Sequence, residues 1–119
     1  MGFREHLQDV CQGVDGALAC SLMGVDGIEV DTHIAAEAEV DVKSLLVEFS
    51  NLFRGAGEAA TANQAGGVSE LSLNTEKLWT VARLVSPEYF MAVALRPQGN
   101  IGKARFLLRI TAPKVRAEL

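Results

Sequence analysis

Long apolar runs, cysteines and paired metal ligands are all scarce in this sequence. No uncharged apolar run approaches the roughly 18 to 20 residues that span a bilayer, which argues against integral membrane association. Residues 2–6 carry three ionisable side chains, unlike a secretory leader, so a cytoplasmic location is expected. Cys11 and Cys20 have apolar neighbours and no paired spacing. They are interpreted as buried thiols rather than as a disulfide or a metal site.

Motifs for catalysis and for nucleotide or cation binding are also missing. No Gly-x-Ser-x-Gly elbow occurs, and neither His6 nor His33 has a second ligand at metal spacing. Residues 99–104 lack the glycine spacing of a phosphate loop, and the acidic residues 26–41 lack the pattern of a calcium loop. The sequence therefore predicts no enzymatic activity, no cofactor and no metal site.

Positive charge is concentrated at one end of an acidic chain. The formal net charge is −4, made up of +5 on residues 96–119 and −9 on residues 1–95. An acidic chain is a poor ligand for nucleic acid, so none is expected as a partner. The basic end keeps open the alternative of a peripheral membrane adaptor that uses Arg105, Arg109 and Arg116.

Apolar spacing predicts three helices within one domain, residues 1–119, which is long enough to bury an ordinary core. Asp41 and Asn100 are the expected N-caps of the second and third helices, and Pro113 is expected to kink the third. The first helix runs from Phe3 to Gly13 or Gly16, the second from Asp41 to Gly66 and Gly67, and the third from Asn100 towards Leu119.

Five strands are predicted between these helices. Residues 17–23 and 89–95 are apolar on both faces and belong in the middle of the sheet, whereas the alternating residues 28–32 and 68–73 belong at its edges. Charges discourage pairing at the first edge, so the second is open to a partner strand. A tight turn at Val25-Asp26-Gly27 joins the first two strands. The strands are expected over residues 17–23, 28–32, 68–73, 77–85 and 89–95.

Two helices carry features that fit either a solvated face or an interface. Small residues on the outward stripe of the second helix would let another helix approach closely, although single exposed apolar residues are common on any surface. On the third helix, Phe106, Leu107 and Ile110 widen the apolar arc, and packing against the first helix is favoured over a partner. The core stripe of the second helix comprises Val42, Leu45, Leu46, Phe49, Leu52, Phe53, Ala56 and Ala60, and its outward stripe comprises Ser44, Val47, Asn51, Arg54, Gly55 and Glu58.

The chain resembles the roadblock family, also called dynein light chain 7, and in particular its bacterial members that regulate Ras-like GTPases. The resemblance covers nearly the full length. It rests on the first helix and the strand of residues 16–23, the hairpin of residues 25–28, the Ala-rich second helix, and the start of a basic helix at residues 99–102.

This resemblance implies an α+β, roadblock (profilin-like or longin-like) fold in the order α-β-β-α-β-β-β-α. It implies a five-stranded antiparallel sheet between helices, with strand order 2-1-5-4-3, one helix on one face and two on the other. The central strands are those already placed there by their burial pattern.

The resemblance also implies a non-enzymatic homodimer that regulates or scaffolds a small Ras-like GTPase, since similar proteins pair their third strands and second helices. An activator often supplies an arginine to the transition state, and Arg54 is the best placed candidate. Arg54 and Glu58 are thus the expected GTPase contacts. The expected dimer interface consists of Ser44, Val47, Asn51, Val68, Glu70, Leu71 and Leu73.

A second alternative is a sensor module that binds a small ligand between sheet and helix, as domains of similar topology can. Such a site needs a sizeable cavity with converging polar groups. The predicted core offers mainly Leu, Val, Ala and Phe, so a tightly packed core would argue against it.

Overall fold

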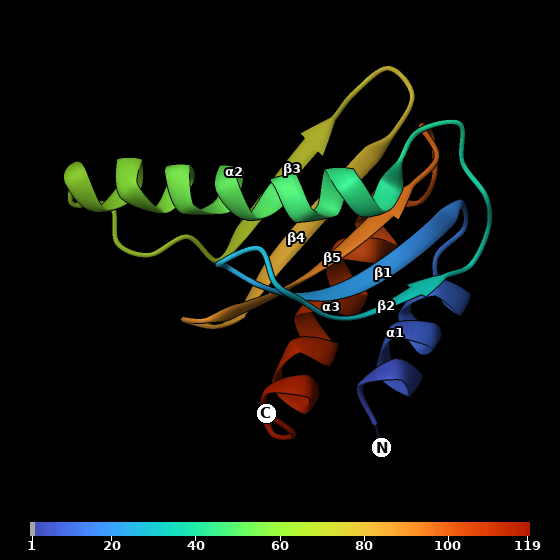
Figure 1. Ribbon diagram of the computed structural model, residues 1–119, viewed down its shortest axis with the longest axis horizontal. Helices are drawn as coiled ribbons and strands as arrows, with labels where there is room; N and C mark the ends of the chain where they lie inside the picture. The colour runs from blue at the N-terminus through green and yellow to red at the C-terminus, as the bar shows by residue number, and fades with distance from the viewer. Residues whose placement is uncertain (1) are drawn as a thin grey trace.

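The computed structural model describes residues 2–119 and has the predicted order of elements (Figure 1). The elements are α1 (Phe3–Gln12), β1 (Ala17–Gly24), β2 (Glu29–Ile34), α2 (Val42–Ala62), β3 (Glu70–Asn74), β4 (Trp79–Ser86), β5 (Tyr89–Leu95) and α3 (Ile101–Arg116).

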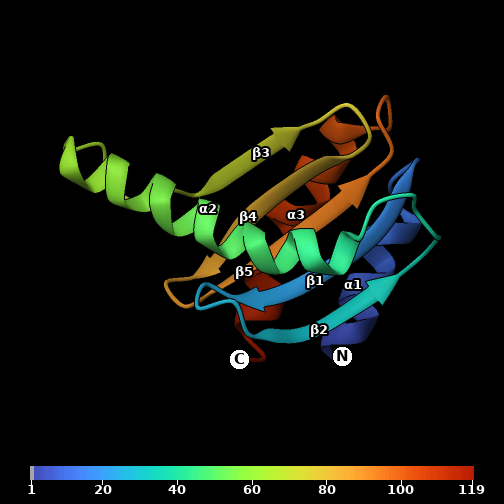
Figure 2. The ribbon, with the colours of Figure 1, turned by 45° about the horizontal axis from the view of Figure 1, so that its top comes forward.

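The five strands form one antiparallel sheet in the order β2-β1-β5-β4-β3, as expected. β5 lies at the centre between β1 and β4, and β2 and β3 form the two edges. Helix α2 crosses one face, while α1 and α3 lie on the other (Figures 1 and 2). The α+β fold is therefore confirmed.

The core has two layers because successive side chains of a strand point to opposite faces of the sheet. On β1, Cys20 and Leu22 belong to the cluster beneath α1 and α3, whereas Ala19 and Met23 belong to the cluster beneath α2. Both layers are buried almost completely. This explains why the sequence of β1 is apolar throughout.

Three aromatic rings fasten α2 to the sheet. Phe90 of β5 lies 5.3 Å from the ring of Phe53 and 6.4 Å from that of Phe49, measured between centroids. Small neighbouring side chains on this face of the sheet, including Ala82 and Ala92, leave room for the rings. The rings therefore set the position of α2 above the sheet.

Both predicted N-caps are confirmed. The carboxylate of Asp41 accepts a hydrogen bond from the Ser44 N–H at 3.0 Å, and the side chain of Asn100 accepts one from the Lys103 N–H at 3.0 Å. α1 ends at Gln12, and Gly13, one of its two expected stops, is its C-cap. α3 remains helical beyond Pro113 as far as Arg116.

The prediction that α2 runs to Gly66 and Gly67 was wrong, because the helix ends at Ala62. Gln64 adopts a left-handed conformation, with φ of 57°, which turns the chain away from the helix axis. The Ala65 N–H then donates to the Ala60 carbonyl at 2.8 Å and closes the last turn. A helix end of this kind usually carries glycine, so Gln64 could not be recognised from the sequence as the residue that ends α2.

The starts of three strands also differ from the prediction. β2 starts at Glu29 rather than at Ile28, because Ile28 lies in the turn, where its N–H donates to the Asp26 carboxylate at 3.0 Å. β4 starts at Trp79 because Leu78 bonds back to Thr75 in the preceding turn. β3 spans Glu70–Asn74, two residues later than expected at its start.

The prediction that Phe106, Leu107 and Ile110 of α3 pack against the first helix is only partly correct. Leu107 packs against the core beside Gly13, as expected. Phe106 and Ile110 are instead 43% and 41% exposed, because they lie on the outer side of the helix. The apolar arc of α3 therefore continues onto the surface.

Cys11 and Cys20 are free and buried, as predicted. Burial raises the pKa of the Cys11 thiol from 9.0 to about 11, and it raises the pKa of Cys20 well above its usual value, with the neighbouring Cys11 adding to the shift. Because only the thiolate reacts, we expect both thiols of the native protein to react with Ellman's reagent more than tenfold more slowly than in guanidinium at about pH 8. Rapid labelling of two thiols in the native protein would contradict their placement.

Candidate functional site

The strand β3 presents an unpaired edge of the sheet. The Leu84 N–H donates to the Ser69 carbonyl at 2.9 Å, so these two residues form a hydrogen-bonded pair of the β3–β4 ladder. Hydrogen-bonded and non-hydrogen-bonded pairs alternate along an antiparallel ladder. The backbone N–H and C=O groups of Leu71 therefore bond β4, whereas those of Ser72 point towards the free edge. No segment among residues 2–119 pairs with this edge. It can therefore accept another strand.

Leucine side chains gather where β3 meets one flank of α2. Leu71 and Leu73 of β3 are only partly buried, on the face of the sheet that α2 covers. Leu45 and Leu52, seven residues apart on α2, share the flank opposite to the one that contacts the β1–β2 hairpin. Leu52 is 45% exposed. These four leucines form an apolar surface that this chain leaves incomplete, and we call it the leucine surface.

The other flank of α2 is fastened to the β1–β2 hairpin. Lys43 pairs with Glu29 at 3.8 Å, and Arg54 donates hydrogen bonds to the Val25 carbonyl and to the side chain of Asn51. Gly27 at the hairpin turn has a φ of 91°, as its predicted role requires, and lies beside Ser50 of α2. These contacts join the hairpin to α2 along this flank.

Figure 1 shows the C-terminal half of α2 projecting past the sheet. Space is open around Gly55 and Gly57, and Glu58 is exposed there. A recess of about 560 Å³ lies beside Arg54, Glu58 and Gly67. This segment is available to a partner on several sides.

The seven predicted interface residues lie in four places. Leu71, Leu73 and the partly buried Val68 meet on the α2 side of β3, but Glu70 points to the opposite face, where it pairs with Arg83 and Arg105. Ser44 and Asn51 lie on the outer side of α2, and Val47, 39% exposed, lies on the hairpin flank.

Sequence reasoning missed Leu45 and Leu52 by assigning them to the core stripe of α2. Leu52 is in fact exposed and Leu45 only partly buried. The signal was present, because eight apolar residues on one helix cover a wider arc than a single packed face needs.

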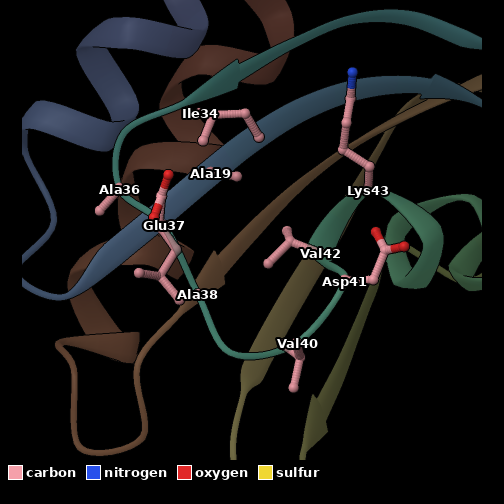
Figure 3. A pocket seen from close by; sticks show the side chains of 10 residues that line it. Ala19, Ile34, Ala36, Glu37, Ala38, Val40, Asp41, Val42 and Lys43 are labelled. Carbon is pink, nitrogen blue, oxygen red and sulfur yellow. The ribbon is translucent and has the colours of Figure 1, made fainter.

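A pocket of about 230 Å³ lies between the start of α2 and the segment that follows β2 (Figure 3). Its lining is mostly aliphatic, as shown by Ile34 and Val40. Of its three charged side chains, Asp41 caps α2 and Lys43 pairs with Glu29, which leaves Glu37. This groove offers few groups that could orient a small polar ligand.

Two features relevant to function are absent from residues 2–119. No helix in that part of the chain is long and apolar enough to cross a bilayer. The same residues contain no group of three or more His, Cys, Asp or Glu side chains placed to hold a metal ion.

Comparison with known proteins places this arrangement in a family. MglC from Myxococcus xanthus is 54% identical over the full length of both chains, with a TM-score of 0.72. A roadblock/LC7 domain from Streptomyces avermitilis has a TM-score of 0.85 at 13% identity, covering 99% of this chain and 98% of that one. A gliding protein, MglB from Thermus thermophilus, has a TM-score of 0.83 at 12% identity, covering 98% and 89%.

Neither the family models nor the curated proteins gave a match. The full-length identity to MglC is far above the level at which fold alone would be inferred, and the roadblock/LC7 structures share the same sheet and helices. This chain belongs to the roadblock/LC7 family.

Proposed function

We propose that this protein is a non-enzymatic homodimer that regulates or scaffolds a small Ras-like GTPase in the cytoplasm. The observation that carries the proposal is the open edge of β3 beside the leucine surface. Two copies related by a twofold axis would pair their β3 strands into one continuous sheet and cover the leucines of both. The family likeness, including that to a gliding protein, supports a role in signalling rather than in catalysis.

The proposed dimer interface combines Leu45 and Leu52 with the residues expected from the sequence. Leu71 and Leu73 contribute apolar area, and Ser72 contributes backbone hydrogen bonds. Edge pairing fixes the register between copies, while burial of the leucines supplies most of the free energy. Ser44, Asn51 and Val47 would lie further out along α2.

The proposed GTPase contact is the surface around Arg54 and Glu58. Arg54 already donates to the Val25 carbonyl and to Asn51, so it would have to break both bonds to reach a bound nucleotide. This favours a contact that holds or reshapes the GTPase over an arginine inserted into its active site. A scaffold or a modulator of switch loops fits this arrangement better than a supplier of catalytic charge.

We expect Arg54→Ala to weaken binding of a cognate Ras-like GTPase by about tenfold, as loss of one or two hydrogen bonds at an interface would do. The homodimer should persist, because Arg54 lies on the hairpin flank. Isothermal titration calorimetry measures the affinity. Arg116→Ala, on the opposite face, is the matched control and should bind normally.

Because Arg54→Ala also loosens the hairpin, Glu58→Lys provides a second variant of the same surface. Glu58 is exposed and forms no hydrogen bond or ion pair within residues 2–119, so its replacement should leave the fold intact. Normal GTPase binding by both variants would remove the α2 surface from the proposal. A wild-type dimer that binds no GTPase encoded nearby would contradict the proposal that a GTPase is the partner.

The two alternatives have less support. A small-ligand sensor needs an enclosed site with converging polar groups, whereas the groove in Figure 3 is mostly aliphatic. A peripheral membrane adaptor needs basic side chains on an accessible face, and α3 does carry them, but Glu70 holds Arg105 at 2.8 Å. Salt-sensitive binding to anionic vesicles would support the peripheral membrane adaptor instead.

A further inference from the structure

A basic pocket lies between α3 and β3, on the face of the sheet opposite to α2. Its volume is about 340 Å³. The side chains that define it are Glu70 of β3, Arg83 of β4, and Arg105, Phe106 and Arg109 of α3. We call it the arginine pocket. None of its residues belongs to the proposed GTPase contact, and of the expected dimer-interface residues only Glu70 lies in it, so the pocket needs a separate explanation.

The pocket holds more positive charge than its own carboxylate can balance. Glu70 accepts a hydrogen bond from the Arg105 Nε at 2.8 Å, and its other oxygen lies 3.9 Å from an Arg83 nitrogen. Arg109 has no carboxylate within ion-pair distance among residues 2–119. The cavity is therefore lined by three guanidinium groups and one carboxylate, which gives a net charge of +2.

An exposed aromatic ring lies beside this charge. The Lys103 ammonium is 5.8 Å and the Arg109 guanidinium carbon 5.6 Å from the centroid of the Phe106 ring. Ile110, one helical turn further along α3, is exposed next to it. The surface thus combines unpaired cations with apolar area in one place.

We infer that the arginine pocket is a docking site for an acidic segment of a protein partner, one that carries apolar side chains among its Asp and Glu residues. Its carboxylates would pair with Arg109, the guanidinium of the pocket that has no carboxylate partner among residues 2–119, because guanidinium groups bind carboxylates in a two-pronged geometry. Its apolar side chains would cover Phe106 and Ile110. The site goes beyond the proposed function, since it assigns a second partner surface to the chain.

Charge and shape favour a peptide over a lipid surface. A bilayer presents a broad, flat surface, whereas this pocket is a local recess between β3, β4 and α3. The rest of the chain is acidic, with −9 on residues 1–95, and opposes approach to any extended anionic surface. A short acidic segment needs only the local positive charge.

The pocket is complete within one protomer, so peptide binding does not depend on the dimer. A monomeric variant should therefore bind the peptide as well as the wild type does. Loss of the dimer with retained peptide binding, or the reverse, separates failure of the proposed function from failure of this inference.

The test uses fluorescence anisotropy with a fluorescein-labelled peptide of sequence Glu-Asp-Leu-Glu-Glu-Phe-Glu-Asp. We expect saturable binding that Arg109→Glu weakens at least about tenfold, the effect of reversing a charge at a direct contact. Arg116→Glu is the matched control, because it makes the same charge change on the same helix about 10 Å further along. It should alter the affinity less than about twofold at 0.1 M salt, where screening acts over that distance.

Glu70→Gln gives a result that a damaged fold would not produce. Removing the competing carboxylate frees Arg105 and Arg83 for the peptide, so the affinity should rise by a factor of about three or more. Absence of peptide binding, equal loss in Arg109→Glu and Arg116→Glu, or binding only to phosphatidylserine vesicles would each overturn the inference. A peptide with Gln and Asn in place of its acids should not bind.

Discussion

Replacing Ser72 with proline should convert the dimer into a folded monomer. The Ser72 N–H points to the free edge of β3, so proline removes a donor that only a second copy would use, and its ring obstructs the approaching strand. Because the proposed dimer is twofold symmetric, the substitution affects the interface at both β3 strands. We expect dimerisation to weaken by about 100-fold, measured by sedimentation velocity over a range of concentrations.

The neighbouring residue supplies the control for this change. Leu71 bonds inward to β4, so Leu71→Pro removes a hydrogen bond of the monomer itself and should lower the free energy of unfolding. Circular dichroism and thermal unfolding distinguish the two variants. If Ser72→Pro stayed dimeric while remaining folded, the interface would have to lie elsewhere.

Replacing Phe90 with alanine should destabilise the protein by about 3 to 5 kcal/mol, the usual cost of removing a buried phenylalanine. The Phe90 ring is fully buried and contacts both rings by which α2 is fastened to the sheet. Loss of this contact should also loosen α2 and the leucine surface that it carries. Urea unfolding measures the change in free energy.

Phe106→Ala is the matched control for the loss of an aromatic ring. This ring lies on the surface of α3, so the free energy of unfolding should change by less than about 1 kcal/mol. Similar losses in both variants would contradict the assignment of Phe90 to the core and of Phe106 to the surface.

Much of the fold could be predicted from local chemistry. The caps at Asp41 and Asn100 and the turn glycine Gly27 act through nearest neighbours, and such contacts are visible in the sequence. The central place of β1 and β5 followed from burial on both faces. The end of α2 could not be predicted, because it depends on a left-handed Gln64 that residue type disfavours.

The site was less predictable because it depends on contacts between distant segments. Arg54 is exposed in the helical pattern, yet its guanidinium reaches a carbonyl 29 residues away in the hairpin. Leu52 belongs to an apolar stripe, yet no segment of residues 2–119 covers it fully. Glu70 belongs to the alternating pattern of an edge strand, but its two arginine partners come from β4 and α3. A helical wheel or strand pattern shows which side a residue faces, and only the assembled fold shows what it meets.

The most direct test of the proposed dimer is its mass in solution. Sedimentation equilibrium at about 100 µM should give twice the protomer mass of 12.7 kDa, and the mass should fall towards one protomer in Ser72→Pro. A wild-type protein that sediments as a single 12.7 kDa protomer at that concentration would show that the edge of β3 and the leucine surface are not joined by a second copy.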